Sequence, residues 1–169
     1  MDRDQILEAL STLAKRLHER EIQGEMYLVG GAAIALAYDA RRATRDIDAV
    51  FEPKLAIYEV AAEMAEELDL PVGWLNDAVK GFLGGDDPSA APVLDLPGLR
   101  CLVASSRMLL ALKVLAHRSG EDENDLRLLA SELGLESATE ALAVVEEVFG
   151  DRLDAGARFF VEQVLDGRP

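Results

Sequence analysis

The chain has 169 residues, of which 50% are hydrophobic and 29% are charged, and its formal net charge is −15. These values suit one globular domain, or an α/β core with a small helical annex. The acidic balance disfavours loose binding to nucleic acid, because such binding depends on neutralising phosphates.

The N-terminal sequence, the absence of a long apolar run and the cysteine content predict a cytoplasmic protein. The N-terminus is charged and lacks the apolar core of a signal peptide. No apolar run approaches the roughly 20 residues that span a bilayer, so we expect no membrane segment. The single cysteine, Cys101, lies in an apolar run and cannot form an internal disulfide, which fits a reducing compartment.

The first part of the chain alternates between helical and strand patterns. A short apolar run, Met26 to Val29, ends at Gly30-Gly31, and Asp46 to Phe51 alternates charged and apolar residues. These patterns predict helices over residues 3–20, 32–38 and 56–68, and strands over 26–29 and 46–51.

The second part of the chain is mostly helical. Residues 71–83 are mixed, with Asn76-Asp77 as a plausible helix cap, and 84–92 reads as a loop. We expect strands over 93–96 and 99–104, then helices over 106–118, 124–133, 137–149 and 155–165. The order predicts an α+β fold, with a small mixed sheet flanked by helices and a helical C-terminal half. The expected division is a core over residues 1–104 and a helical part over 105–169.

Two carboxylates carry the strongest chemical signal. Asp46 and Asp48 stand two apart on a predicted strand, so both side chains should face the same way while Ile47 faces the core. Paired carboxylates on one face can bind a hard divalent cation such as Mg²⁺ or Mn²⁺. Such a metal can hold triphosphate oxygens and activate a hydroxyl.

The Gly30-Gly31 pair lies between a predicted strand and a predicted helix. Without Cβ atoms, this backbone can come close to a phosphate, and the amides that begin the helix then point at the anion. Arg45 stands beside the carboxylates and could bind phosphate, while Thr44 could support the turn.

Each of these features alone is usually structural. A Gly-Gly turn is common, and an Asp-x-Asp pair is most often an exposed strand edge. The combination of these features is much rarer and favours a nucleotide site. It consists of a strand, a Gly-Gly turn, a helix and a second strand that carries Asp-x-Asp. A stretch without acidic residues, 96–120, carries a few cations that could form a local basic groove or could be chance clustering: Arg100, Arg107, Lys113 and Arg118. A second small cluster holds Arg41, Arg42 and Arg45.

The stretch from Val29-Gly30-Gly31 to Thr44-Arg45-Asp46-Ile47-Asp48 resembles the signature of the DNA polymerase β-like nucleotidyltransferase superfamily. Later features, Lys113 in an apolar helix followed by Asp125-Leu126, look like motifs of AbiEii-type nucleotidyltransferase toxins. The chain looks closest to the DUF6036 group, which Trp74-Leu75-Asn76-Asp77 also resembles.

The resemblance implies a role for each matched residue. Gly30 and Gly31 would hold the triphosphate of an NTP substrate, and Asp46 and Asp48 would bind the metal. Lys113 would contact nucleotide phosphate, and Asp125 would position Lys113 or the acceptor. Apart from the resemblance, a charged lysine in an apolar helix needs an oppositely charged partner or a route to solvent. We therefore expect Lys113 to point toward the cleft of Gly30-Gly31 and Asp46-x-Asp48. An ordinary lysine that reaches solvent, with a surface Asp125, is the alternative.

Two departures from the superfamily pattern affect the site. Many relatives have Gly-Ser where this chain has Gly30-Gly31, which removes one hydroxyl ligand to phosphate. Polymerase-like enzymes also use a third carboxylate on a later strand. Asp95 is the candidate here, and Asp77 is the runner-up.

Two functions of different classes follow from the resemblance. The first is a metal-dependent nucleotidyltransferase that moves a nucleotidyl group from an NTP to a hydroxyl of RNA, protein or a small molecule, in a toxin–antitoxin or phage-defence setting. The second is a catalytically degenerate binding module that acts as an antitoxin or regulatory partner of a cognate toxin or antitoxin protein. The third carboxylate discriminates between them.

Overall fold

The computed structural model describes residues 1–77 and 86–167. The chain forms two compact units. One contains Met1–Leu83 and Ser89–Ala104, and the other contains Gly84–Pro88 and Ser105–Pro169. The predicted α+β class, with a mixed sheet flanked by helices, is confirmed. Residues 78–85 lie outside the described residues. They include the end of the mixed stretch 71–83 and the start of the predicted loop 84–92.

The first unit is built on a five-stranded sheet of the described residues, in the order β3-β2-β1-β5-β4. Its strands are β1 Gly24–Val29, β2 Ile47–Glu52, β3 Leu75–Asn76, β4 Ala91–Leu96 and β5 Leu99–Val103. β1 runs antiparallel to β2 and parallel to β5, while β2–β3 is parallel and β4–β5 is antiparallel. Pro92 lies in β4, where an edge strand tolerates a residue without an N–H.

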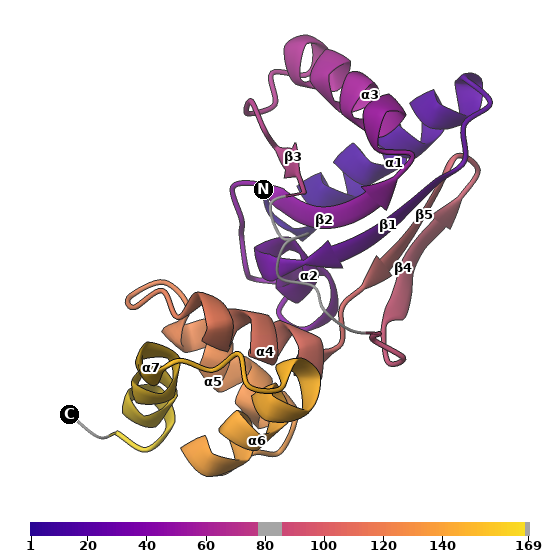
Figure 1. The fold of residues 1–169 in the computed structure, drawn as a ribbon. Coiled ribbons are helices and arrows are strands. Elements are labelled where there is room, and N and C mark those ends of the chain that lie inside the picture. The colour runs from indigo at the N-terminus through magenta and orange to yellow at the C-terminus, as the bar shows by residue number, and fades with distance from the viewer. Residues whose placement is uncertain (78–85, 168–169) are drawn as a thin grey trace. The chain divides into compact units, whose positions relative to one another are not determined.

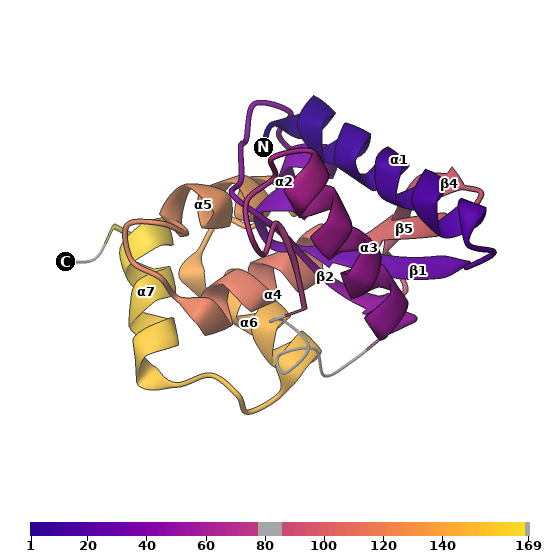
Figure 2. The ribbon, with the colours of Figure 1, turned by 90° about the horizontal axis from the view of Figure 1, so that it is seen from above.

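Three helices cover one face of this sheet: α1 Arg3–Glu19, α2 Gly30–Ala37 and α3 Lys54–Glu67 (Figure 1 and Figure 2). Strand alternation decides which side chains they cover. Along β2, Ile47, Ala49 and Phe51 are buried against the helices. Asp48, Val50 and Glu52 alternate with them and face the other way. Cys101 is buried in β5, and burial raises the pKa of its thiol to about 12, so it belongs to the core.

Leu75–Asn76 forms a strand that the sequence did not predict, because it pairs with β2 as strand β3 and the Ile47 N–H donates to the Trp74 carbonyl. Any helix that Asn76-Asp77 would cap lies outside the described residues. A buried Trp74, whose indole N–H donates to the Ala61 carbonyl, anchors this strand beside α3. α2 also begins earlier than predicted, at Gly30.

The second unit is helical in its described residues. It contains α4 Ser106–Ala116, α5 Glu123–Glu132, α6 Ala138–Phe149 and α7 Ala155–Leu165. The side chains of Ser105, Ser137 and Asp154 cap α4, α6 and α7 by accepting a backbone N–H in the first turn. α4 packs against each of the other three helices and forms the centre of this unit. Within the described part of the chain, no helix is both long enough and apolar enough to cross a bilayer.

Candidate functional site

The Asp48 carboxylate lies directly against the Gly30 backbone. Asp48 is the cross-strand partner of Val29, the last residue of β1, so its side chain stands over the turn into α2. A Cβ atom added to Gly30 would lie 2.8 Å from Asp48 Oδ2. Gly30 also has a φ of +63°, a backbone conformation that favours glycine. The acidic strand and the Gly-Gly turn therefore lie next to each other, as the spacing of the motif predicts.

The start of α2 offers amides to an anion beside that carboxylate. The N-cap residue is Val29, and among the described residues no side chain caps the helix by accepting its first N–H groups. Orphan N–H groups and the helix dipole make such an end favourable for phosphate. The Gly30-Gly31 turn thus presents backbone N–H groups where the sequence predicts an anion-binding surface.

Thr44 and Arg42 lie over Gly31. A Cβ atom on Gly31 would lie 2.8 Å from Thr44 Oγ1 and 3.9 Å from Arg42 Nη2. Thr44 is held from both sides, because its Oγ1 donates to the Asp46 carbonyl and its N–H donates to the Met1 carbonyl. The Arg42 guanidinium donates to the Ala43 carbonyl. The loop before β2 therefore brings a hydroxyl and a guanidinium to the glycine turn.

The guanidinium nearest to the turn is not the one that the sequence suggested. Arg45 is adjacent to the carboxylates in the chain, yet its side chain is exposed, whereas Arg42 is half-buried with its Nη2 beside Gly31. Neighbours in sequence on an irregular loop point in different directions, so spacing alone could not rank the three arginines of this cluster. Arg42 is a site residue that the sequence analysis missed.

Asp46 lies one residue before β2 and is joined to β3. Asn76 Nδ2 donates to Asp46 Oδ2 over 3.1 Å, and Asn76 is also the register partner of Asp48. Asp46 and Asp48 are half-buried on either side of the fully buried Ile47, which agrees with the predicted common face. Asn76 is the second residue that the sequence analysis missed, because it was assigned to a helix cap.

The structure does not bring Asp95 to this pair. Asp95 on β4 is paired with Arg100 on β5, Arg100 with Glu25 on β1, and Glu25 with Glu52 on β2. Asp95 therefore stands in the cross-strand row of Glu52, four residues along β2 from Asp48, or about 13 Å along the strand direction. It is also three strands away, since β4 is the edge strand beyond β1 and β5.

Asp77 is directed toward α3. Its side chain accepts a hydrogen bond from Tyr58 Oη over 2.7 Å and forms an ion pair with Lys54. The hydrogen bond from Lys54, then that from Tyr58, holds the pKa of Asp77 below its ordinary value. Alternation explains this direction, because Asn76 faces Asp46 and the following residue faces the opposite side.

A third carboxylate is therefore not found at this site in the described residues. Across residues 1–77 and 86–167, no group of three or more His, Cys, Asp or Glu side chains is placed to hold a metal ion. The oxygen donors that the structure does bring together are the two carboxylates of Asp46 and Asp48 and the amide of Asn76. Carboxylate and amide oxygens are ligands that suit Mg²⁺.

Lys113 has its partners inside the second unit. Its Nζ lies 2.5 Å from Asp122 Oδ1 and 2.8 Å from Asp125 Oδ2, and all three side chains are buried. Arg118 Nε lies 3.4 Å from the other oxygen of Asp122. From the sequence we expect the acidic cleft to attract Lys113, whereas its counter-charge in the structure comes from Asp122, at the N-cap of α5, and Asp125, in the first turn of α5. The expected contact between Lys113 and Asp125 is present.

The cations of the stretch 96–120 do not stand apart from acidic groups. In the second unit, Arg107 is paired with Glu147, and Arg118 contacts Glu121 as well as Asp122. In the first unit, Arg100 stands between Glu25 and Asp95 in the sheet register. Each of these cations has a carboxylate within its own unit, which weakens the interpretation of the stretch as a basic groove for RNA.

The comparison with protein families agrees with the motif. The family model of DUF6036, described as a nucleotidyltransferase of unknown function, matches residues 5–82. This range contains the Gly-Gly turn, the acidic pair and Asn76. No curated protein matches the chain.

Proposed function

From the match of residues 5–82 to the family model of the DUF6036 nucleotidyltransferases, we propose that the protein transfers a nucleotidyl group from an NTP to a hydroxyl acceptor with the help of Mg²⁺ or Mn²⁺. The contact between Asp48 and Gly30 carries the proposal. It places a carboxylate that can hold a cation next to a helix start that can hold a phosphate, which is the combination that a metal–triphosphate complex requires.

The residues present fit such a cation. Asp46 and Asp48 would hold it, with Asn76 beside them. A divalent cation bound here would neutralise triphosphate charge and polarise the reacting phosphoryl group. Glycine at positions 30 and 31 leaves the space that a Cβ would fill, so that Asp48 and Thr44 can approach the turn that would hold the phosphates.

The chain's own groups have three tasks in this reaction. The first amides of α2 and the Arg42 guanidinium bind the β- and γ-phosphates, and Thr44 orients the turn. The acceptor oxygen then forms a bond to the α-phosphorus while the bond from that phosphorus to the bridging oxygen of the β-phosphate breaks. The electron pair leaves with pyrophosphate, and the hydroxyl proton passes to solvent through a carboxylate of the pair.

Binding without turnover is a second candidate function, and one observation favours it. Asp95 and Asp77 are both held elsewhere, so the described residues give the site two carboxylates and one amide. A site with less negative charge holds a divalent cation less strongly. The protein would then be a nucleotide-binding module that acts as an antitoxin or a regulatory partner.

Transfer of label from an NTP separates the two candidates. Incubation with each α-³²P-labelled NTP and Mg²⁺ or Mn²⁺, together with total RNA or cell lysate, should label one acceptor class. The Asp46→Asn/Asp48→Asn variant should give no labelled product. Binding of an NTP without any labelled product in RNA, protein or small-molecule fractions would support the binding module and overturn the transferase.

The biological setting that we propose is a toxin–antitoxin or phage-defence pair, and it rests on the AbiEii-type resemblance. It predicts that expression of the chain alone slows growth, that Asp46→Asn/Asp48→Asn relieves the effect, and that a cognate protein partner also relieves it. Equal growth with the wild type and with this variant would contradict the toxin–antitoxin or phage-defence setting, but it would leave the proposed transfer reaction untested.

A further inference from the structure

The Gly-Gly turn carries a different chemical group over each of its two glycines. Over Gly30 lies the Asp48 carboxylate, with Oδ2 at 2.8 Å from the place that a Cβ atom would take. Over Gly31 lies the Thr44 hydroxyl, with Oγ1 also at 2.8 Å from the place of a Cβ atom. A carboxylate suits a cation, whereas a hydroxyl can donate to an anion. The two glycines therefore separate a cation side of the turn from an anion side.

The Thr44 hydroxyl lies beside the backbone N–H groups that begin α2. Gly30 and Gly31 are the first two residues of this helix, and the first four N–H groups of a helix lack a partner within it. Arg42 Nη2 lies 3.9 Å from the same Cβ position over Gly31. An anion at this point would therefore meet backbone N–H groups, a hydroxyl and a guanidinium.

The Thr44 side chain is held in place, but its hydroxyl hydrogen can turn. The Thr44 N–H donates to the Met1 carbonyl over 2.9 Å, and Oγ1 donates to the Asp46 carbonyl over 3.0 Å. A hydroxyl hydrogen rotates about the Cβ–Oγ1 bond without movement of a heavier atom. Because a charged phosphate oxygen is a stronger acceptor than a neutral carbonyl, an arriving phosphate would attract this hydrogen away from Asp46.

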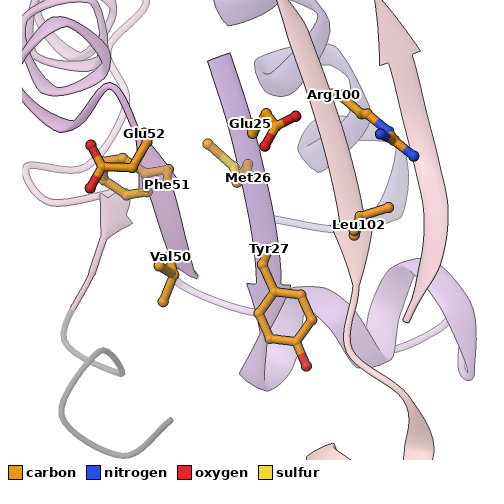
Figure 3. Close-up of a pocket in the computed structure, with 8 residues that line it drawn as sticks. All are labelled: Glu25, Met26, Tyr27, Val50, Phe51, Glu52, Arg100 and Leu102. Atoms are coloured by element: carbon orange, nitrogen blue, oxygen red, sulfur yellow. The ribbon is translucent and has the colours of Figure 1, made fainter. Parts of the chain in front are cut away.

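The sheet of the same unit carries a separate shallow depression of about 240 Å³ (Figure 3). Residues of β1, β2 and β5 line it, and the lining contains neither glycine of the turn nor Thr44. The hydroxyl and the guanidinium over Gly31 therefore form a surface of their own, at the junction of α2 and the loop before β2.

We propose that Thr44 Oγ1 is a phosphate ligand that donates to a non-bridging oxygen of the β- and γ-phosphates of the NTP. This inference rests on the proposed transferase function and adds a side-chain donor to the amides of α2 and to Arg42. The Asp48 side of the turn holds the cation, and the Thr44 side holds the phosphates that leave as pyrophosphate. Glycine at position 31 keeps open the space between the helix start and the Thr44 hydroxyl.

The probe is inorganic tripolyphosphate with Mg²⁺, which offers the phosphates without base or sugar. In calorimetric titration, Thr44→Ser should bind the probe like the wild type, because serine keeps the hydroxyl. Thr44→Val has nearly the same shape as threonine but lacks the hydroxyl, so it should bind the probe about tenfold more weakly.

A pair of double variants moves the hydroxyl from one side of the gap to the other. Gly31→Ser/Thr44→Ala removes Oγ1 and supplies a hydroxyl from position 31, whereas Gly31→Ala/Thr44→Ala is the matched control without a hydroxyl. The serine variant should bind the probe about fivefold more tightly than this control. Gly31→Ser alone should lower the Tm, because its Cβ would lie 2.8 Å from Thr44 Oγ1, and the added Thr44→Ala should restore part of that loss.

Equal affinity of Thr44→Val and the wild type for the probe would overturn the assignment. Equal affinity of Gly31→Ser/Thr44→Ala and its control would do the same. A purely structural role is detected by Mn²⁺ titration without phosphate, followed by EPR. If Thr44→Val lost as much Mn²⁺ affinity as probe affinity, Thr44 would act through the Asp46 loop, and the assignment would again be overturned.

Failure of this inference is distinguishable from failure of the proposed function. If the wild type binds the probe and Thr44→Val binds it equally well, the assignment of Thr44 is wrong and the transferase proposal stands. If the wild type binds neither the probe nor any NTP, both proposals are contradicted.

Discussion

Gly30 shows how a single position serves both backbone and site. Its φ of +63° requires a conformation that costs other residues about 1–2 kcal/mol. In addition, Asp48 Oδ2 lies only 2.8 Å from the place that a Cβ atom would take. A substitution here therefore strains the turn and displaces a carboxylate of the proposed site at once.

Gly30→Ala should destabilise the protein more than Gly134→Ala does. Gly134 has a similar φ of +67°, but nothing lies within 4 Å of its missing Cβ, so it measures the cost of the backbone alone. Urea unfolding of both variants checks the prediction. Equal losses of unfolding free energy would mean that Asp48 moves away from Gly30 without cost.

Lys113 illustrates a buried charge that depends on its partners. Removing it leaves Asp122 and Asp125 buried without their common counter-charge. Breaking one side of a buried ion pair typically costs about 3–5 kcal/mol. The structure thus predicts a large contribution of Lys113 to folding.

Lys113→Met should therefore lower the free energy of unfolding by several kcal/mol. The control is Lys15→Met, since Lys15 is exposed and pairs with Glu19 at 3.9 Å, a contact of about 0–1 kcal/mol at most. Chemical denaturation of both variants measures the difference. A loss at Lys113 no larger than at Lys15 would refute the structural role of this cluster.

At the scale of elements, β3 is held in place by its connection to α3. Asp77 follows β3 and joins Tyr58 and Lys54 of α3, while Asn76 reaches across to Asp46. The Asp77 ion pair raises the pKa of Lys54 and lowers that of Asp77. We call the contacts of Asp77 with Tyr58 and Lys54 the Asp77 clamp. This clamp holds β3, and with it Asn76, beside the acidic pair.

The stabilisation from this clamp should be lost in acid. Because the folded-state pKa of Asp77 is lowered, its contribution is present above the ordinary aspartate pKa and disappears as the pH falls through the lowered value. Unfolding free energies from neutral to acidic pH should show Asp77→Asn destabilised near pH 7 and converging on the wild type in acid. Glu66→Gln, at an exposed position of α3, should track the wild type throughout. A difference between Asp77→Asn and the wild type that does not change with pH would contradict the clamp.

Periodicity predicts the elements that carry the two halves of the motif, because β1, α2 and β2 have clear apolar patterns and alternation fixes the common face of Asp46 and Asp48. β3 could not be found in this way, since a strand of two residues has no period to detect. The sequence does not reveal that Asp95 lies far from the acidic pair, because alternation gives the face of a strand but neither its register nor its place in the sheet. These depend on long-range pairing.

At the scale of the whole molecule, the match to the nucleotidyltransferase family falls within the first unit. It covers residues 5–82, whereas α4 to α7 of the second unit lie beyond it. The net charge of −15 and the ion pairs of Arg107 and Arg118 both disfavour RNA as the acceptor. The proposed chemistry therefore rests on the described residues of the first unit.

The central claim is that Asp46, Asp48 and the Gly30-Gly31 turn form one cation-dependent nucleotide site. Calorimetric titration with each of the four NTPs, with Mg²⁺ or with EDTA, tests it most directly. The wild type should bind at least one NTP only when Mg²⁺ is present. Asp46→Asn/Asp48→Asn should lose at least tenfold in affinity while keeping or raising its Tm, because the two carboxylates repel each other without a cation. Glu59→Gln/Glu66→Gln should bind like the wild type. Unchanged affinity in Asp46→Asn/Asp48→Asn would show that the acidic pair is structural and would contradict the account.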